Sequence, residues 1–103
     1  MNHSDPFDLQ SQDKAAADNS DKTKLAHQVE IDDLKFLMSN KRGRRFVCRL
    51  LERAGVWRIS FNTNALTMAF NEGMRNEGLR LMSQMTIHCA DRYAEMIKES
   101  KEP

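Results

Sequence analysis

The residues whose types and spacing best suit them to bind another molecule are basic and lie close together. They are Lys41, Arg42, Arg44, Arg45, Arg49 and Arg53. On a helix they would spread around the polar side of an apolar stripe, where guanidinium groups can pair with phosphates or with an acidic protein surface. The alternative is a solvated face that pairs with the chain's own acids, such as Glu30, Asp32 and Asp33. Because one Trp lies nearby and no base-reading motif is present, a nucleic-acid site here would be indifferent to base sequence.

The net charge of the chain is close to zero, but the charges are unevenly placed. The formal net charge is +1. Residues 1–40 hold eight acidic and four basic residues, residues 41–58 hold seven basic and one acidic, and residues 59–103 hold five basic and six acidic. An acidic opening segment therefore precedes a basic middle segment, and the basic segment is the main electrostatic feature of the sequence.

The histidines and cysteines do not form a metal site or a catalytic pair. His3, His27 and His88 share no helical spacing of three or four residues with each other or with a cysteine. Cys89 directly follows His88, and helical neighbours point about 100° apart, so the two cannot form a nucleophile and base pair. We interpret Cys48 and Cys89 as reduced core thiols rather than a disulfide, and we expect no metal.

Other catalytic patterns are missing as well. Ser60 and Ser83 lack the flanking glycines of a nucleophile elbow. Gly73 and Gly78 are not followed by Lys-Ser or Lys-Thr, as a phosphate loop requires. We therefore expect no enzymatic activity and no cofactor.

The opening of the chain is polar and acidic. Residues 1–21 contain one Phe, one Leu and no β-branched residue, which is too little apolar surface to offset the entropy of ordering. We expect a disordered acidic tail over residues 1–21 and a helical domain over residues 22–103. Neither a signal peptide nor a membrane span is indicated, which predicts a protein made in the cytoplasm.

Two helices are predicted after the tail. From Lys22, apolar residues recur close to the helical period, at Leu25, Val29, Leu34, Leu37 and Met38. A second stripe follows at Phe46, Val47, Leu50, Leu51 and Ala54. Ser39 and Asn40 can cap the start of this second helix. Gly55 can end it after Ala54, because glycine adopts the left-handed conformation without a Cβ penalty.

The next connection is unusually apolar. Between Gly55 and Thr63 it carries Val56, Trp57, Ile59 and Phe61. We expect an ordered loop whose side chains enter the core. A helix–turn–helix DNA reader is a further alternative, although this connection is too long and too apolar for the usual turn of three or four residues.

A long amphipathic pattern follows Asn64, which can cap it. Its members are Leu66, Phe70, Met74, Gly78, Leu81, Met85, Cys89 and Met96. The pattern predicts one long helix, or two helices joined near Gly73 to Gly78. Two glycines so close together indicate a kink or close contact with another helix, and close packing is the favoured reason.

The far end of this pattern is a candidate interface. A helix from Leu66 to Ile97 would be about 50 Å long, whereas one from Asn40 to Ala54 would span about 22 Å and could not cover it. We expect Met85, Cys89, Tyr93 and Met96 to stay partly uncovered, which favours a homo-oligomer or docking on a partner. The chain has seven methionines, and methionine-rich surfaces bind adaptably, but core packing is the favoured explanation for most of them.

Two stretches resemble a family of small helical proteins of tailed bacteriophages, typified by a protein of a short-tailed Bordetella phage. The first runs from Phe61 to Met82 and contains Glu72, Gly73, Arg75 and Gly78 within a Glu-Gly-x-Arg-x-x-Gly-Leu-like helix. The second, Arg45 to Gly55, is similar to the family's preceding helix. The likeness covers about residues 35–97 and leaves the acidic tail outside it.

The resemblance implies a virion component or assembly factor, because the family's genes lie among head and tail morphogenesis genes. It assigns no catalytic residues, and it suggests packing and an ion pair for Glu72, Gly73, Arg75 and Gly78. We expect an all-α fold, a helical hairpin or three-helix assembly with a disordered N-terminal tail. The expected function is a non-enzymatic virion or assembly protein that binds its own copies or other virion proteins. The alternative is a small nucleic-acid-binding module, a packaging or regulatory factor, that uses the basic helix 41–53.

Overall fold

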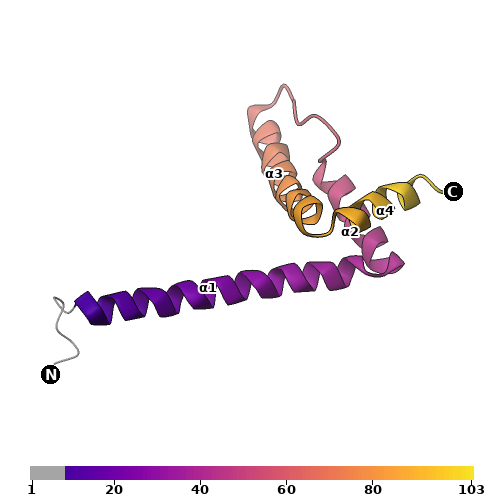
Figure 1. Cartoon of the computed structure of the whole chain (residues 1–103). Helices are drawn as coiled ribbons and strands as arrows, with labels where there is room; N and C mark the ends of the chain where they lie inside the picture. Colours follow the sequence, from indigo (N-terminus) through magenta and orange to yellow (C-terminus); the bar gives the residue numbers. More distant parts are fainter. Residues whose placement is uncertain (1–8) are drawn as a thin grey trace. The chain divides into compact units, whose positions relative to one another are not determined.

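The computed structural model describes residues 9–103, which form four α-helices and, over that range, no strand (Figure 1). The helices are α1 (Leu9–Met38), α2 (Lys41–Ala54), α3 (Ala65–His88) and α4 (Ala90–Ser100). The predicted all-α class is therefore confirmed. The chain divides into two compact units, residues 1–32 and residues 33–103. We call residues 33–103 the folded body.

Helix α1 begins at Leu9, well before the Lys22 start that the sequence predicted. The predicted tail, residues 1–21, therefore belongs in part to a helix, and its first eight residues lie outside the described ones. Between Leu9 and Glu30 every side chain is exposed except half-buried Ser11. The prediction weighed only the burial of apolar surface. Alanine, lysine and glutamine, which are frequent here, favour the helix by their intrinsic propensity without any core.

The turn from α1 to α2 is held by Asn40 and Gly43. The Asn40 side chain accepts a hydrogen bond from the Gly43 N–H at 2.8 Å, which confirms the predicted cap. A Cβ atom on Gly43 would lie 1.8 Å from the Leu37 carbonyl oxygen, so the backbone approach at this turn requires glycine. At the other end of α2, Gly55 adopts the predicted left-handed conformation, with φ 81°.

The break in the last amphipathic segment lies at Cys89, not near Gly73 to Gly78. Asn64 caps α3 as predicted, accepting hydrogen bonds from the Leu66 and Thr67 N–H groups. A Cβ on Gly78 would lie 2.6 Å from Val56 and 2.8 Å from Ala54, so Gly78 marks close packing of α3 on the end of α2. Around Gly73 the described residues leave open space, so it neither kinks the helix nor packs.

The core of the folded body lies where α2, α3 and α4 meet. Its buried residues are Met38, Val47, Leu51, Val56, Met85 and Met96. The expectation that Met85 and Met96 stay uncovered is wrong, because they are 0% and 1% exposed. Cys89 and Tyr93 are half-buried against the same core. The break at Cys89 lets α4 pack on α2, which covers the stripe that a single straight helix would have left exposed.

Two further packing expectations need correction. Of the apolar residues in the connection after α2, only Val56 enters the core, and Trp57, Ile59 and Phe61 are exposed. The second expectation is that the Leu50–Ala54 side of α2 packs on the Leu66–Leu81 side of α3, but the Leu66 end does not pack there, since Leu66 is 83% exposed. Helix α2 instead packs beside the later part of α3, around Gly78.

Candidate functional site

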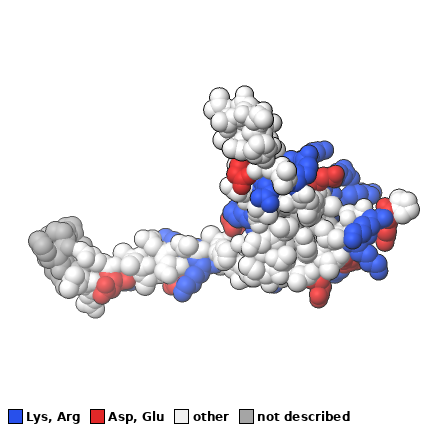
Figure 2. Space-filling model, turned by 90° about the horizontal axis from the view of Figure 1, so that it is seen from above, with Lys and Arg blue, Asp and Glu red and all other residues white. Residues whose placement is uncertain are grey.

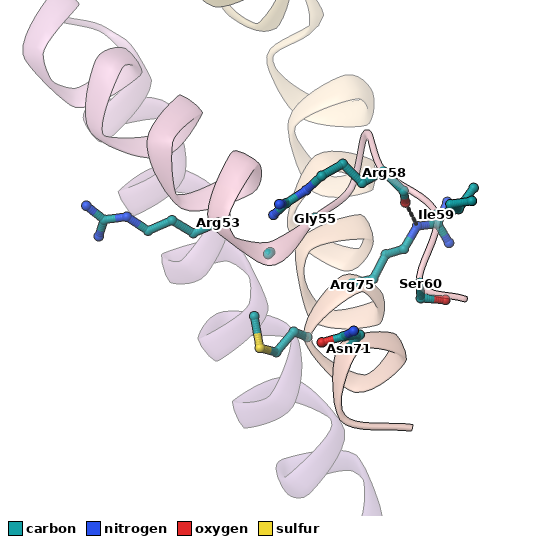
Figure 3. A pocket seen from close by; sticks show the side chains of 9 residues that line it. Arg53, Gly55, Arg58, Ile59, Ser60, Asn71 and Arg75 are labelled. Carbon is teal, nitrogen blue, oxygen red and sulfur yellow. Dashed lines mark hydrogen bonds between the residues drawn. The ribbon is translucent and has the colours of Figure 1, made fainter. Parts of the chain in front are cut away.

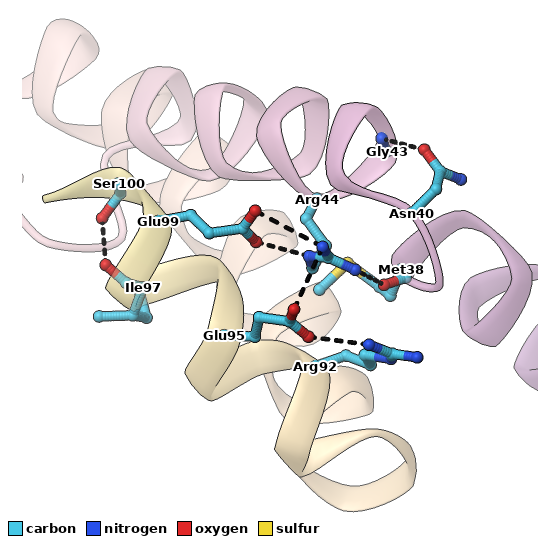
Figure 4. Close-up of polar contacts among 9 residues, drawn as sticks. All are labelled: Met38, Asn40, Gly43, Arg44, Arg92, Glu95, Ile97, Glu99 and Ser100. Carbon is cyan, nitrogen blue, oxygen red and sulfur yellow. Dashed lines mark hydrogen bonds and ion pairs between the residues drawn. The ribbon is translucent and has the colours of Figure 1, made fainter. Parts of the chain in front are cut away.

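One member of the basic run, Arg44, is not available to a ligand. Figure 4 shows its guanidinium group between two carboxylates of α4 and the carbonyl oxygen of Met38. The Arg44 Nε lies 2.6 Å from the Glu99 Oε1, and its Nη2 lies 3.4 Å from the Glu95 Oε1. The side chain is 7% exposed. Its place among the candidate binding residues is therefore wrong: Arg44 joins α2 to α4 and to the end of α1.

The sequence could not identify these partners. The acids that proximity in sequence suggests are Glu30, Asp32 and Asp33, whereas Glu99 is 55 positions away from Arg44. A bidentate fork between arginine and carboxylate is strong because two charge-assisted hydrogen bonds act together. Only the packing of α4 on α2 brings the two groups together.

The other five members of the run, Lys41, Arg42, Arg45, Arg49 and Arg53, are exposed. No ion pair joins any of them to a carboxylate within residues 9–103. They are not equivalent. Lys41, Arg45 and Arg49 line a hollow together with the carboxylates of Glu99 and Glu102, so part of their field is offset there.

The ion pair gives stability a specific dependence on pH. The hydrogen bond from the Arg44 guanidinium lowers the pKa of the Glu99 carboxyl below its usual 4.5. A lowered carboxyl pKa stabilises the fold at pH values above 4.5, and this contribution is lost as the pH falls through the folded-state pKa.

We therefore expect Glu99→Gln to reduce the unfolding midpoint at pH 7 and to have progressively less effect as the pH falls below about 4.5. Thermal unfolding of both proteins between pH 7 and pH 2 measures this. Glu102→Gln, an exposed neighbour that makes no ion pair in the described chain, serves as the control. A Glu99→Gln effect of the same size at every pH would contradict the assignment.

A hollow next to the α2 end brings three arginines together from separate segments. Figure 3 shows Arg53 at the end of α2, Arg58 in the connection and Arg75 on α3. Two of them already have partners: Arg58 donates to the Glu52 carbonyl oxygen at 2.9 Å, and Arg75 donates to the Arg58 carbonyl oxygen at 3.1 Å. These two side chains therefore hold the connection against α2 and α3.

The four residues of the motif that resembles the phage family, Glu72, Gly73, Arg75 and Gly78, differ in their contacts and burial. The Arg75 Nη1 lies 3.9 Å from the Glu72 Oε1, and the Ser60 hydroxyl donates to the Glu72 carboxylate. Gly78 is buried in the helix packing, whereas Gly73 is exposed. Glu72 and Arg75 thus hold the connection between α2 and α3 against α3.

The surface that sequence reasoning missed is apolar. Residues 59–71 contain no Asp, Glu, Lys or Arg. We call them the charge-free segment. Ile59 is 88% exposed, and Phe61, Leu66 and Phe70 are also exposed. Figure 2 shows a white projection without blue or red atoms, as expected of such a segment. The signal in the sequence is the run of uncharged residues, which by itself predicts core as readily as an exposed apolar surface.

The two cysteines are free thiols with little reactivity. Burial raises the pKa of Cys48 and of Cys89, and Glu52 adds to the effect at Cys48. Both thiols are therefore protonated at neutral pH, and the thiol is a much weaker nucleophile than the thiolate. This agrees with their interpretation as reduced core residues.

The geometry defines a class of protein: a small all-α protein with a closed internal core and an exposed apolar segment. In the part of the chain described, no cluster of His, Cys, Asp and Glu could hold a metal ion. No helix of residues 9–103 is both long and apolar enough to cross a membrane.

Residues 34–98 match the model of the Bbp19-like phage protein family. The match covers more than half of the chain, and the protein belongs to this family of phage proteins. The matched range agrees closely with the range of the resemblance, about residues 35–97. No curated protein and no solved structure matches the chain.

Proposed function

We propose that the protein is a non-enzymatic component or assembly factor of the phage virion, made in the cytoplasm of the bacterial host. It acts through protein–protein contacts. Membership of a phage family supports the setting. The observation that carries the proposal is the charge-free segment, whose large apolar side chains face solvent on the folded body. Clustered exposed apolar residues of this kind are typical of interaction surfaces.

The proposal is tested in phage that carry a nonsense codon in this gene. Genome copies and finished particles are measured in the same infected culture, and particles are viewed by electron microscopy. We expect normal genome replication with few or no complete particles. A normal yield of infectious particles would overturn the proposal, and so would a loss of genome replication itself.

Complementation then tests the charge-free segment. Phe61→Ser with Phe70→Ser should fail to restore particles, because the two exposed rings are removed without touching the core. The matched control is Ile87→Ser, since Ile87 is as exposed as Phe70, 67% against 68%, but lies outside the segment. Equal rescue by both proteins would show that the segment makes no essential contact.

A second function, nucleic-acid binding, is favoured by one observation: the five exposed basic side chains of α2 without ion pairs in the described chain. In that case log affinity for duplex DNA falls with log salt by about 0.9 per phosphate neutralised. Arg42→Gln with Arg45→Gln should flatten this slope by about two such contacts. Arg80→Gln, whose guanidinium pairs with Glu77, is the control. No binding of duplex or single strands at low salt would exclude this second function.

A further inference from the structure

The folded body carries an apolar groove between α2 and α3. Its lining includes Leu50 and Ala54 from α2 and Met74 and Leu81 from α3. A smaller hollow lined by Phe46 and Leu50 adjoins it, since both hollows share Leu50 and Arg53. We call the two together the α2–α3 groove. Phe46 and Leu50 are exposed, so this apolar surface faces solvent within the chain.

The charge along the groove is unbalanced. Arg49 and Arg53 flank its α2 side, both exposed and neither ion-paired within residues 9–103. On the α3 side, Glu77 and Arg80 pair with each other at 2.7 Å, and this contact lowers the pKa of Glu77. The groove therefore presents an apolar floor, and one of its walls carries two exposed arginines that form no ion pair within residues 9–103.

Helix α1 carries a surface of matching chemistry. Six of its residues recur at steps of three or four and so share one helical face: Asp18, Asp21, Leu25, Val29, Asp32 and Phe36. We call this the acidic α1 face. All six are exposed. Leu34 and Met38, which pack in the core, lie on the opposite side of the helix. The acidic α1 face thus combines three apolar side chains with three carboxylates, and Lys14 and Lys22, each four residues from Asp18, border it.

We infer that the acidic α1 face of one copy binds in the α2–α3 groove of a second copy. An amphipathic helix binds a groove by laying apolar anchors at steps of three and four onto the groove floor. Asp18 and Asp21 lie about one turn apart, as Arg49 and Arg53 do, so these two carboxylates face the arginine pair, and Asp32 lies about 17 Å further along α1. The pairing fixes partner and register by charge complementarity.

The second copy is the occupant because the chain itself carries both complementary surfaces, and the residues named on each are exposed. A reciprocal exchange between two copies buries both faces and both grooves in one symmetric dimer. The inference rests on the proposed function and deepens it, since it names the partner of one surface.

Two charge-reversed full-length proteins test the inference. The first carries Asp18→Lys, Asp21→Lys and Asp32→Lys, so that its α1 face and its groove are both positive. The second carries Arg49→Glu and Arg53→Glu, so that both are negative. All five positions are exposed on helices and lysine and glutamate are good helix formers, so both proteins should fold. Circular dichroism checks this.

Light scattering after size exclusion should show a dimer for the wild type, with dissociation promoted by salt. Each reversed protein alone should be a monomer, its dimer affinity weakened by about a hundredfold or more through like-charge contact. An equimolar mixture of the two should recover the dimer, because each α1 face then meets a groove of opposite charge.

The control protein carries Arg42→Glu and Arg45→Glu, which changes the net charge equally at exposed α2 positions outside the groove. It should dimerise like the wild type. A monomeric wild type, dimers of either reversed protein alone, or a mixture that stays monomeric would each overturn the inference. None of these outcomes bears on whether the nonsense phage lose their particles, so the two proposals fail separately.

Discussion

Gly43→Ala should lower the free energy of unfolding of the folded body by more than about 3 kcal/mol, which is beyond the usual cost of overpacking. The added Cβ would lie 1.8 Å from the Leu37 carbonyl oxygen. This atom belongs to the backbone and cannot rotate away, so the whole turn between α1 and α2 must open. Urea unfolding followed by the fluorescence of Trp57, the only tryptophan of the chain, measures the change.

Gly73→Ala is the matched control, because it adds the same methyl group to a helix of the same body. The described residues leave that position open, and alanine is the better helix former. This substitution should raise stability by up to about 1 kcal/mol. If both substitutions lowered the free energy of unfolding equally, the close approach of Gly43 to Leu37 would not be the reason that this turn requires glycine.

Arg44→Ala is expected to lower the free energy of unfolding by about 3 kcal/mol. This is the lower end of the range for removing one partner of a buried ion pair. The substitution leaves the Glu99 and Glu95 carboxylates and the Met38 carbonyl oxygen without their shared donor. The loss of stability is limited because both carboxylates are partly exposed, so water replaces some of the lost hydrogen bonds. Urea unfolding at pH 7 measures the difference.

Two further substitutions test whether the loss of stability is specific to the Arg44 fork. Arg44→Lys keeps the charge but loses the planar fork, so it should fall between the wild type and Arg44→Ala. Arg45→Ala removes the exposed neighbouring arginine and should change stability by less than about 0.5 kcal/mol. If Arg44→Ala were as mild as Arg45→Ala, the buried link between α2 and α4 would have no structural importance.

The sequence determined the all-α class, the bounds of α2 and the caps at Asn40, Gly55 and Asn64. These features are local, because a cap or a left-handed glycine acts on residues within a few positions of itself. The family resemblance was also readable from the sequence, since it depends on short motifs. The start of α1 was missed because apolar periodicity does not register a helix formed by propensity on an exposed segment.

Tertiary structure decided which side chains are buried and which remain available to bind. Periodicity showed that Met85 and Met96 belong to an apolar stripe, but only the break at Cys89 brings α4 onto α2 and covers them. The same packing removes Arg44 from the basic surface by placing Glu99 beside it. It also leaves Ile59, Phe61 and Leu66 in solvent, although their composition resembles core. Burial and ion pairing depend on contacts between residues that are distant in sequence. The local pattern identifies the apolar face of each helix, but it does not show which of these faces pack against one another.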